Sequence, residues 1–102
     1  MKMRHHLRLP LRCPVMFSTD AIIGEGRVLD LGVPGCAVHS EVVPAPGEYV
    51  RLHILTPNVD GAFAVQVAKV RWVQPHQFGV EFLRFDDGQQ VTVRRLFEAL
   101  EN

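Results

Sequence analysis

Two arginines near the start of the chain have a spacing that lets them act on one ligand. Arg4 and Arg8 are four residues apart, and side chains at this spacing project to the same side in a helix and in an extended segment. A guanidinium group binds anions through paired hydrogen bonds, so two of them can converge on a single ligand. A solvated arm that binds nothing is the alternative interpretation.

A second candidate stretch runs from Asp30 to Gly35 and has the sequence Asp-Leu-Gly-Val-Pro-Gly. Gly32 and Gly35 allow backbone angles that other residues avoid, and they let a ligand approach the main chain closely. Aspartate and glycine are also the ordinary residues of turns, so this stretch by itself is typical of a plain turn.

The histidines and cysteines form no recognisable metal or catalytic motif. None shows the spacing C-x-x-C or H-x-x-x-H. These residues are His5, His6, His39, His53, His76, Cys13 and Cys36. Cys36 adjoins Gly35, but a free cysteine more often packs as a small apolar residue. We predict no metal site and no catalytic residue. A hydrolase built on Cys36 and a histidine is kept as a third hypothesis, which predicts turnover and inactivation by thiol alkylation.

The composition indicates one globular domain. The chain has 102 residues, of which 47% are hydrophobic and 22% charged, and this excludes wholesale disorder. Eleven basic and eleven acidic side chains give zero net charge, which argues against a binder of nucleic-acid polymers or membranes. We find no signal peptide, no apolar run near the roughly 20 residues of a membrane-spanning helix, and no disulfide framework. We therefore expect a cytoplasmic protein.

The basic residues are unevenly distributed. Residues 1–12 hold four of the eleven basic side chains, and the first acidic residue is Asp20. A basic arm on a mildly acidic body suits one compact anionic ligand better than a long polyanion, which requires phosphate contacts spread over a face.

Short apolar-alternating runs separated by Gly and Pro predict six β-strands. The expected strands cover residues 13–19, 22–31, 35–40, 48–55, 63–73 and 78–85. Pro44 and Pro46 cannot donate to a strand ladder, so the segment around them is expected to be a loop. Gly24 and Gly26, near the start of the second strand, are a place where a β-bulge can form. Trp72 is interpreted as a core or barrel-rim residue rather than a stacking surface. This pattern fits a small antiparallel barrel or sandwich.

The last segment changes to a helical period. Val93, Leu96, Phe97 and Leu100 lie at positions i, i+3, i+4 and i+7, which predicts an amphipathic helix within residues 86–101. Because a helix of about three turns is marginal on its own, we expect its apolar stripe to pack on the barrel as a lid over one open end.

The two candidate stretches, in this order, resemble the PilZ domain family, whose bacterial members carry an Arg-x-x-x-Arg element and a downstream Asp/Asn-x-Ser-x-x-Gly element. Further similar stretches are Arg8–Val15, Gly35–Val38, Pro46–Val50, Val70–Val73 and Phe78–Phe82. The resemblance implies one domain over residues 1–102, built as a six-stranded antiparallel β-barrel with a C-terminal helix. Its parts would be a flexible basic arm (1–12), the barrel (13–85) and the helix (86–101).

The resemblance also implies that the chain binds cyclic di-GMP, a bacterial second messenger. Arg4, Arg8, Asp30, Gly32 and Gly35 would then form the site. The arginines would hold a phosphate or a guanine edge, Asp30 would accept from guanine N1 and N2, and the two glycines would offer backbone amides and close approach. Gly32 departs from the family pattern, which has serine there. Losing one neutral hydrogen bond costs about 1 kcal/mol, a fivefold to tenfold weakening.

The expected function is therefore that of a non-catalytic receptor without a cofactor. Ligand would dock the N-terminal arm on the barrel and so signal to an unidentified effector protein, in processes such as motility or biofilm control. We expect a monomer or weak homodimer, with no nucleic-acid polymer as partner and no membrane insertion. The alternative is a protein-interaction adaptor of the same fold that does not bind nucleotide, for example in type IV pilus or motility control.

Overall fold

A computed structural model describes residues 12–32, 34–55 and 62–85. For residues 62 and 63 it describes the backbone only. The strands are β1 (Pro14–Ser18), β2 (Ile23–Leu31), β3 (Gly35–His39), β4 (Tyr49–Leu55), β5 (Ala62–Gln74) and β6 (Gln77–Phe85). They follow the predicted strands closely, because alternation of apolar and polar residues is the main signal of a half-buried strand.

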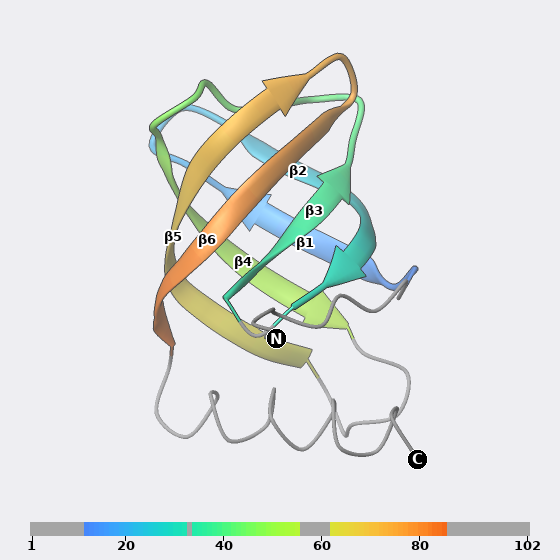
Figure 1. Ribbon diagram of the computed structural model, residues 1–102, viewed down its shortest axis with the longest axis vertical. Coiled ribbons are helices and arrows are strands. Elements are labelled where there is room, and N and C mark those ends of the chain that lie inside the picture. The colour runs from blue at the N-terminus through green and yellow to red at the C-terminus, as the bar shows by residue number, and fades with distance from the viewer. Residues whose placement is uncertain (1–11, 33, 56–61, 86–102) are drawn as a thin grey trace, which may run out of the picture.

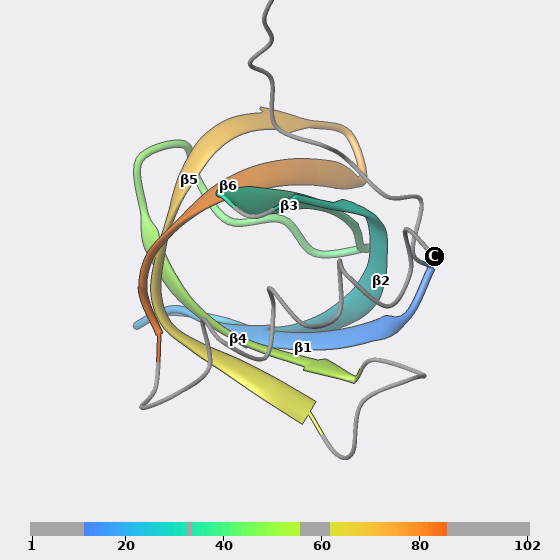
Figure 2. The same ribbon diagram turned by 60° about the horizontal axis from the view of Figure 1, so that its bottom comes forward.

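The strands form a closed barrel in the order β1-β2-β3-β6-β5-β4, and every neighbouring pair is antiparallel. Figure 1 shows the barrel from the side, and Figure 2 shows the closed ring of strands from one end. β1 pairs with both β2 and β4, so among the described residues each of the six strands has two neighbouring strands and none is an edge strand. The predicted six-stranded antiparallel barrel is confirmed. Arg4, Arg8 and the helix predicted within 86–101 lie outside the described residues.

The core is formed by side chains that alternate inward along each strand. In β4, Val50, Leu52 and Ile54 are buried, whereas the residues between them are exposed. Phe17 of β1 and Phe78 of β6 meet edge to face in the centre, with their ring centroids 5.0 Å apart. Such a pair adds about 1 kcal/mol to the burial of the two rings.

The bulge expected near Gly24 and Gly26 is wrong in position. β1 and β2 pair without interruption through both glycines, and the irregularity lies between Val28 and Asp30, where β2 pairs with β3. The two glycines are explained by packing. A Cβ on Gly24 would overlap the ring of Phe17, and a Cβ on Gly26 would overlap a backbone carbonyl oxygen of β3.

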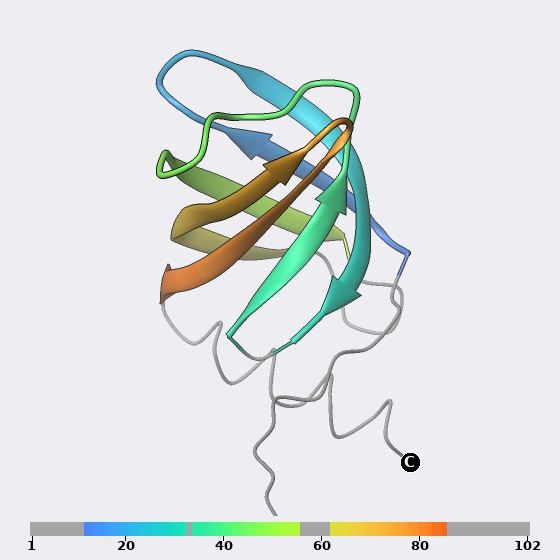
Figure 3. The same cartoon turned by 45° about the horizontal axis from the view of Figure 1, so that its top comes forward.

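The segment between β3 and β4 is a loop, as its two prolines predicted. Figure 3 shows it running across one end of the barrel. Gly47 has a φ of 86°, a conformation that favours glycine, and its amide donates to Val70 O at 2.9 Å.

Within the described residues, no helix is long and apolar enough to cross a membrane.

Candidate functional site

The stretch from Asp30 to Gly35 runs from the end of β2 through a short turn to the first residue of β3. Gly32 N donates to Gly35 O at 2.8 Å, and Gly35 N donates to Gly32 O at 3.3 Å, so two backbone hydrogen bonds close the turn. Phe82 N donates to Pro34 O at 2.7 Å and fastens the turn to β6. Three backbone hydrogen bonds therefore hold the described residues of the turn together and join them to β6.

These hydrogen bonds correct one expectation. The amides of Gly32 and Gly35 are already used within the turn, so they are not available to a ligand in this structure. What Gly35 provides is close approach of two strands. A Cβ at this position would overlap the carbonyl oxygen of Val80 and lie 3.1 Å from its carbonyl carbon.

A row of four residues crosses the outside of the barrel beside this turn. Asp30 of β2 pairs with Ala37 of β3, Ala37 with Gly79 of β6, and Gly79 with Trp72 of β5. We call this row the outer shelf. Its two middle residues, Ala37 and Gly79, are small and buried, and the carboxylate of Asp30 and the indole of Trp72 stand at its two ends.

Trp72 lies on the surface of the shelf. A Cβ on Gly79 would overlap the pyrrole side of the indole and lie 2.8 Å from Cζ2, so the ring covers the space that glycine leaves free. The residue is 40% exposed. Of the two interpretations offered for this residue, core or barrel rim, the core position is therefore wrong. The structure shows instead an aromatic surface on the same face of the barrel as the β2–β3 turn.

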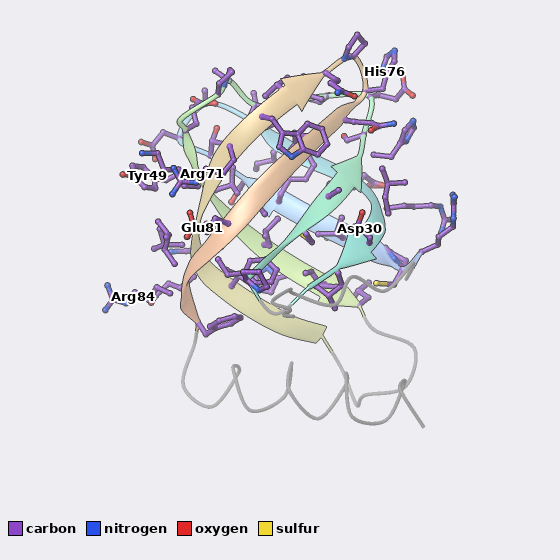
Figure 4. All side chains as sticks on the ribbon, in the orientation of Figure 1. Asp30, Tyr49, Arg71, His76, Glu81 and Arg84 are labelled. Carbon is purple, nitrogen blue, oxygen red and sulfur yellow. The ribbon has the colours of Figure 1, made fainter. Side chains whose placement is uncertain are left out.

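A hollow of about 230 Å³ adjoins the shelf and the turn. The turn contributes Pro34 and Gly35 to its lining, β5 contributes Arg71 and Trp72, and β6 contributes Gly79 and Glu81. Arg71 and Glu81 form an ion pair in which Nε donates to Oε1 at 2.7 Å and Nη2 reaches the same oxygen. Figure 4 shows this pair on the β5–β6 side and Asp30 on the side of β2 and β3.

The structure thus places Asp30, Gly32 and Gly35 at and beside the turn between β2 and β3, and it adds three residues that the sequence analysis did not assign to a site. These are Trp72, Arg71 and Glu81. A glycine within an apolar strand, as at Gly79, was the available signal, because such a glycine often marks the close approach of another group. The sequence could not indicate that this group is Trp72.

The described histidines gather no metal site. His39 and His76 lie at the far end of β3 from the turn, with ring centroids 6.3 Å apart, and His76 Nδ1 is 3.7 Å from Glu41 Oε1. Within residues 12–32, 34–55 and 62–85, no group of three or more His, Cys, Asp or Glu side chains is arranged to hold a metal ion.

Both cysteines are free thiols buried in the core, Cys13 at 4% exposure and Cys36 at 1%. Burial raises the pKa of the Cys13 thiol above its ordinary value of 9.0, an effect partly offset by a backbone hydrogen bond. A buried neutral thiol is a poor nucleophile, because the thiolate is the reactive form. This burial disfavours the hydrolase hypothesis.

We predict that iodoacetamide labels the native protein at least about tenfold more slowly than the urea-unfolded chain, because labelling requires opening of the barrel. For Cys13, a pKa that is higher in the folded than in the unfolded state means that burial of the neutral thiol contributes fully to stability at neutral pH. It is lost as pH rises above 9.0 through the folded-state value. Mass spectrometry against time measures the labelling. Equal rates in the native and unfolded states would contradict the burial of both thiols.

Comparison with known families gives one match. The sequence model of the PilZ domain matches residues 2–99, a range that includes both arginines and all six strands. No curated protein matches the chain.

Solved structures that share the fold include three with the following similarity to this chain. The PilZ domain of CeSA from a cellulose-synthesizing bacterium is 20% identical, with a TM-score of 0.71 over 94% of this chain and 99% of that one. The inhibitor of motility MotI/DgrA of Bacillus subtilis is 18% identical, with a TM-score of 0.75 over 100% of this chain and 54% of that one. YcgR of Escherichia coli, solved in complex with c-di-GMP, is 15% identical, with a TM-score of 0.78 over 96% of this chain and 46% of that one. The chain thus spans about half the length of the last two proteins.

Proposed function

Because this chain belongs to the PilZ domain family, we propose that it is a receptor that binds cyclic di-GMP and passes the signal to a partner protein. PilZ domains are ligand-binding and adaptor domains rather than enzymes. The observation that carries the proposal is the outer shelf, which joins the second family motif at Asp30 to the indole of Trp72 across two small residues.

The chemistry of the shelf suits a guanine nucleotide. The exposed indole of Trp72 offers a flat face on which a base can stack. The carboxylate of Asp30 can accept from guanine N1 and N2, which are adjacent donors on that base, whereas adenine N1 is an acceptor. Arg4 and Arg8 would supply the charge that two phosphates require. We propose Arg4, Arg8, Asp30 and Trp72 as ligand contacts, with Gly32 and Gly35 shaping the turn.

The signal would arise from the N-terminal arm. Residues 1–12 carry two of the proposed contacts, whereas Asp30 and Trp72 belong to the barrel, so ligand would fasten the arm to the barrel and change the surface offered to an effector protein. We propose that the protein acts in the cytoplasm as a monomer or weak homodimer. NMR relaxation of residues 1–12 tests the switch, because equal mobility in the free and bound protein would contradict it.

Isothermal titration calorimetry tests the binding directly. We expect cyclic di-GMP to bind the full chain and cyclic di-AMP to give no heat under the same conditions, because Asp30 would meet an acceptor on adenine. Binding of both nucleotides with equal affinity would contradict a guanine-reading site. The absence of binding by either nucleotide at high micromolar concentration would contradict the receptor.

Replacement of Trp72 by alanine is expected to weaken cyclic di-GMP binding by about tenfold, because stacking of a base on an aromatic ring contributes about 1–3 kcal/mol. Trp72→Phe keeps a smaller stacking face and should lose less. Trp72 is the chain's single tryptophan, so its fluorescence also reports binding. Unchanged affinity in the alanine variant, with unchanged wild-type fluorescence on titration, would exclude the indole from the site.

A second candidate function is the adaptor that does not bind nucleotide, and Gly32 is the observation that favours it. If the missing serine hydroxyl only weakens binding, Gly32→Ser should raise affinity for cyclic di-GMP by about fivefold to tenfold, the worth of one hydrogen bond. The same titration measures it. If neither the wild type nor Gly32→Ser binds cyclic di-GMP, the adaptor is favoured.

A further inference from the structure

The ion pair of Arg71 and Glu81 lies at the hollow beside the β2–β3 turn, and neither residue belongs to the two family motifs. Among the described side chains that line this hollow, these two are the charged ones. Both side chains are about half exposed, at 50% and 42%, so solvent and ligand can reach them. A surface pair of this kind contributes little to the stability of a barrel.

We infer that Glu81 limits the affinity of this site for anionic ligands by neutralising Arg71 and by presenting its own negative charge to the ligand. This inference rests on the proposed function. Glu81 pairs in register with Gly35, so its carboxylate stands next to the β2–β3 turn that carries the second family motif. Arg71 Nε and Nη2 are both directed to Glu81 Oε1, so the positive charge of Arg71 faces the Glu81 carboxylate.

The neighbouring cation does not replace Arg71. Lys69 also pairs with Glu81 in register, but its Nζ lies over the ring of Tyr49, 5.6 Å from the ring centroid. This cation–π contact directs the ammonium group toward β4 and away from the hollow. The electrostatic balance of the hollow therefore depends on whether Arg71 is paired with Glu81 or with the ligand.

Phosphate oxygens and the Glu81 carboxylate compete for the same guanidinium donors. A ligand that takes Arg71 must displace Glu81 or share its donors, and it must also tolerate a nearby negative charge. Glu81→Gln separates the two ways in which this residue could act. The amide oxygen of glutamine can still accept from Arg71, so a pure positioning role would survive the change, whereas the negative charge is removed.

The test is titration calorimetry of the full-length chain with cyclic di-GMP at low salt. We expect Glu81→Gln to bind about threefold to tenfold more tightly than the wild type, and Arg71→Gln to bind weaker by a similar factor. The double variant should return close to the wild type, because it removes both charges. At about 0.5 M salt, where the screening length is only a few ångströms, the differences should shrink.

Glu25→Gln is the matched control, because Glu25 is an exposed carboxylate on the outer face of β2 and lines a different hollow. It removes the same charge from the whole protein and should leave affinity unchanged. Unchanged or weaker binding by Glu81→Gln overturns the inference, as does an equal gain in Glu25→Gln. A failure of the proposed function looks different. In that case neither the wild type nor any of the four variants (Glu81→Gln, Arg71→Gln, the double variant and Glu25→Gln) binds cyclic di-GMP, and the inference fails with it.

Discussion

Alanine in place of Arg8 is expected to weaken cyclic di-GMP binding by about a hundredfold or more. Its guanidinium group can make two parallel hydrogen bonds to a phosphate or to the O6/N7 edge of guanine. Each hydrogen bond to a charged group contributes about 1.5–3 kcal/mol, so losing both reduces the binding free energy by about 3–6 kcal/mol. Calorimetry should then detect no saturable binding at ligand concentrations that saturate the wild type.

Two further variants separate the fork of Arg8 from its charge. Arg8→Lys keeps the positive charge but cannot bind two acceptors in one plane, so it should show intermediate affinity. Arg12→Ala removes an exposed arginine four residues further on, outside the Arg4–Arg8 pair and the Asp30–Gly35 stretch, and should leave affinity nearly unchanged. If Arg8→Ala binds as tightly as Arg12→Ala, the Arg-x-x-x-Arg element does not hold the ligand.

The strands could be predicted from the sequence because their alternation is strong. β4 places valine, leucine and isoleucine inward at every second position, and only one register buries all three. The closed strand order could not be read in the same way. The pairing of β1 with β4 joins segments separated by two other strands, and no local pattern encodes this long-range contact.

The sequence could not show that Trp72 belongs to the outer shelf, because the strand pairing there is irregular. β5 and β6 shift register at three places, one of them between Val70 and Trp72. Each irregularity disturbs the simple alternation that assigns side chains to the inside or outside. Trp72 follows Val70 by two positions and would be assigned to the core by alternation, but it faces outward and covers Gly79.

Gly35 is another residue whose role in the structure differs from the role that its sequence motif indicates. From the sequence, Gly35 serves backbone freedom and ligand approach. In the structure its amide bonds within the turn, and the missing side chain lets β3 lie against Val80 of β6. This second role exists without any ligand, and it has a large expected effect on stability.

Alanine in place of Gly35 is therefore expected to lower the free energy of unfolding of the ligand-free protein by about 3 kcal/mol, since overpacking typically costs 1–3 kcal/mol and here backbone rather than a side chain must move. For a domain of this size, the corresponding fall in Tm is roughly 12–24 °C. Urea unfolding followed by fluorescence of the single tryptophan measures the change.

Gly47→Ala is the matched control, because it adds the same methyl group for a different cost. At Gly47 the added Cβ meets nothing within 4 Å, but the φ of 86° is strained for alanine and costs about 1 kcal/mol. Gly35 has no such backbone angle, so its larger penalty must come from contact with Val80. If Gly35→Ala unfolds like the wild type and loses only its affinity for cyclic di-GMP, the glycine serves the ligand and not the barrel. If it unfolds more easily without ligand, loss of binding in this variant is no evidence for a direct contact.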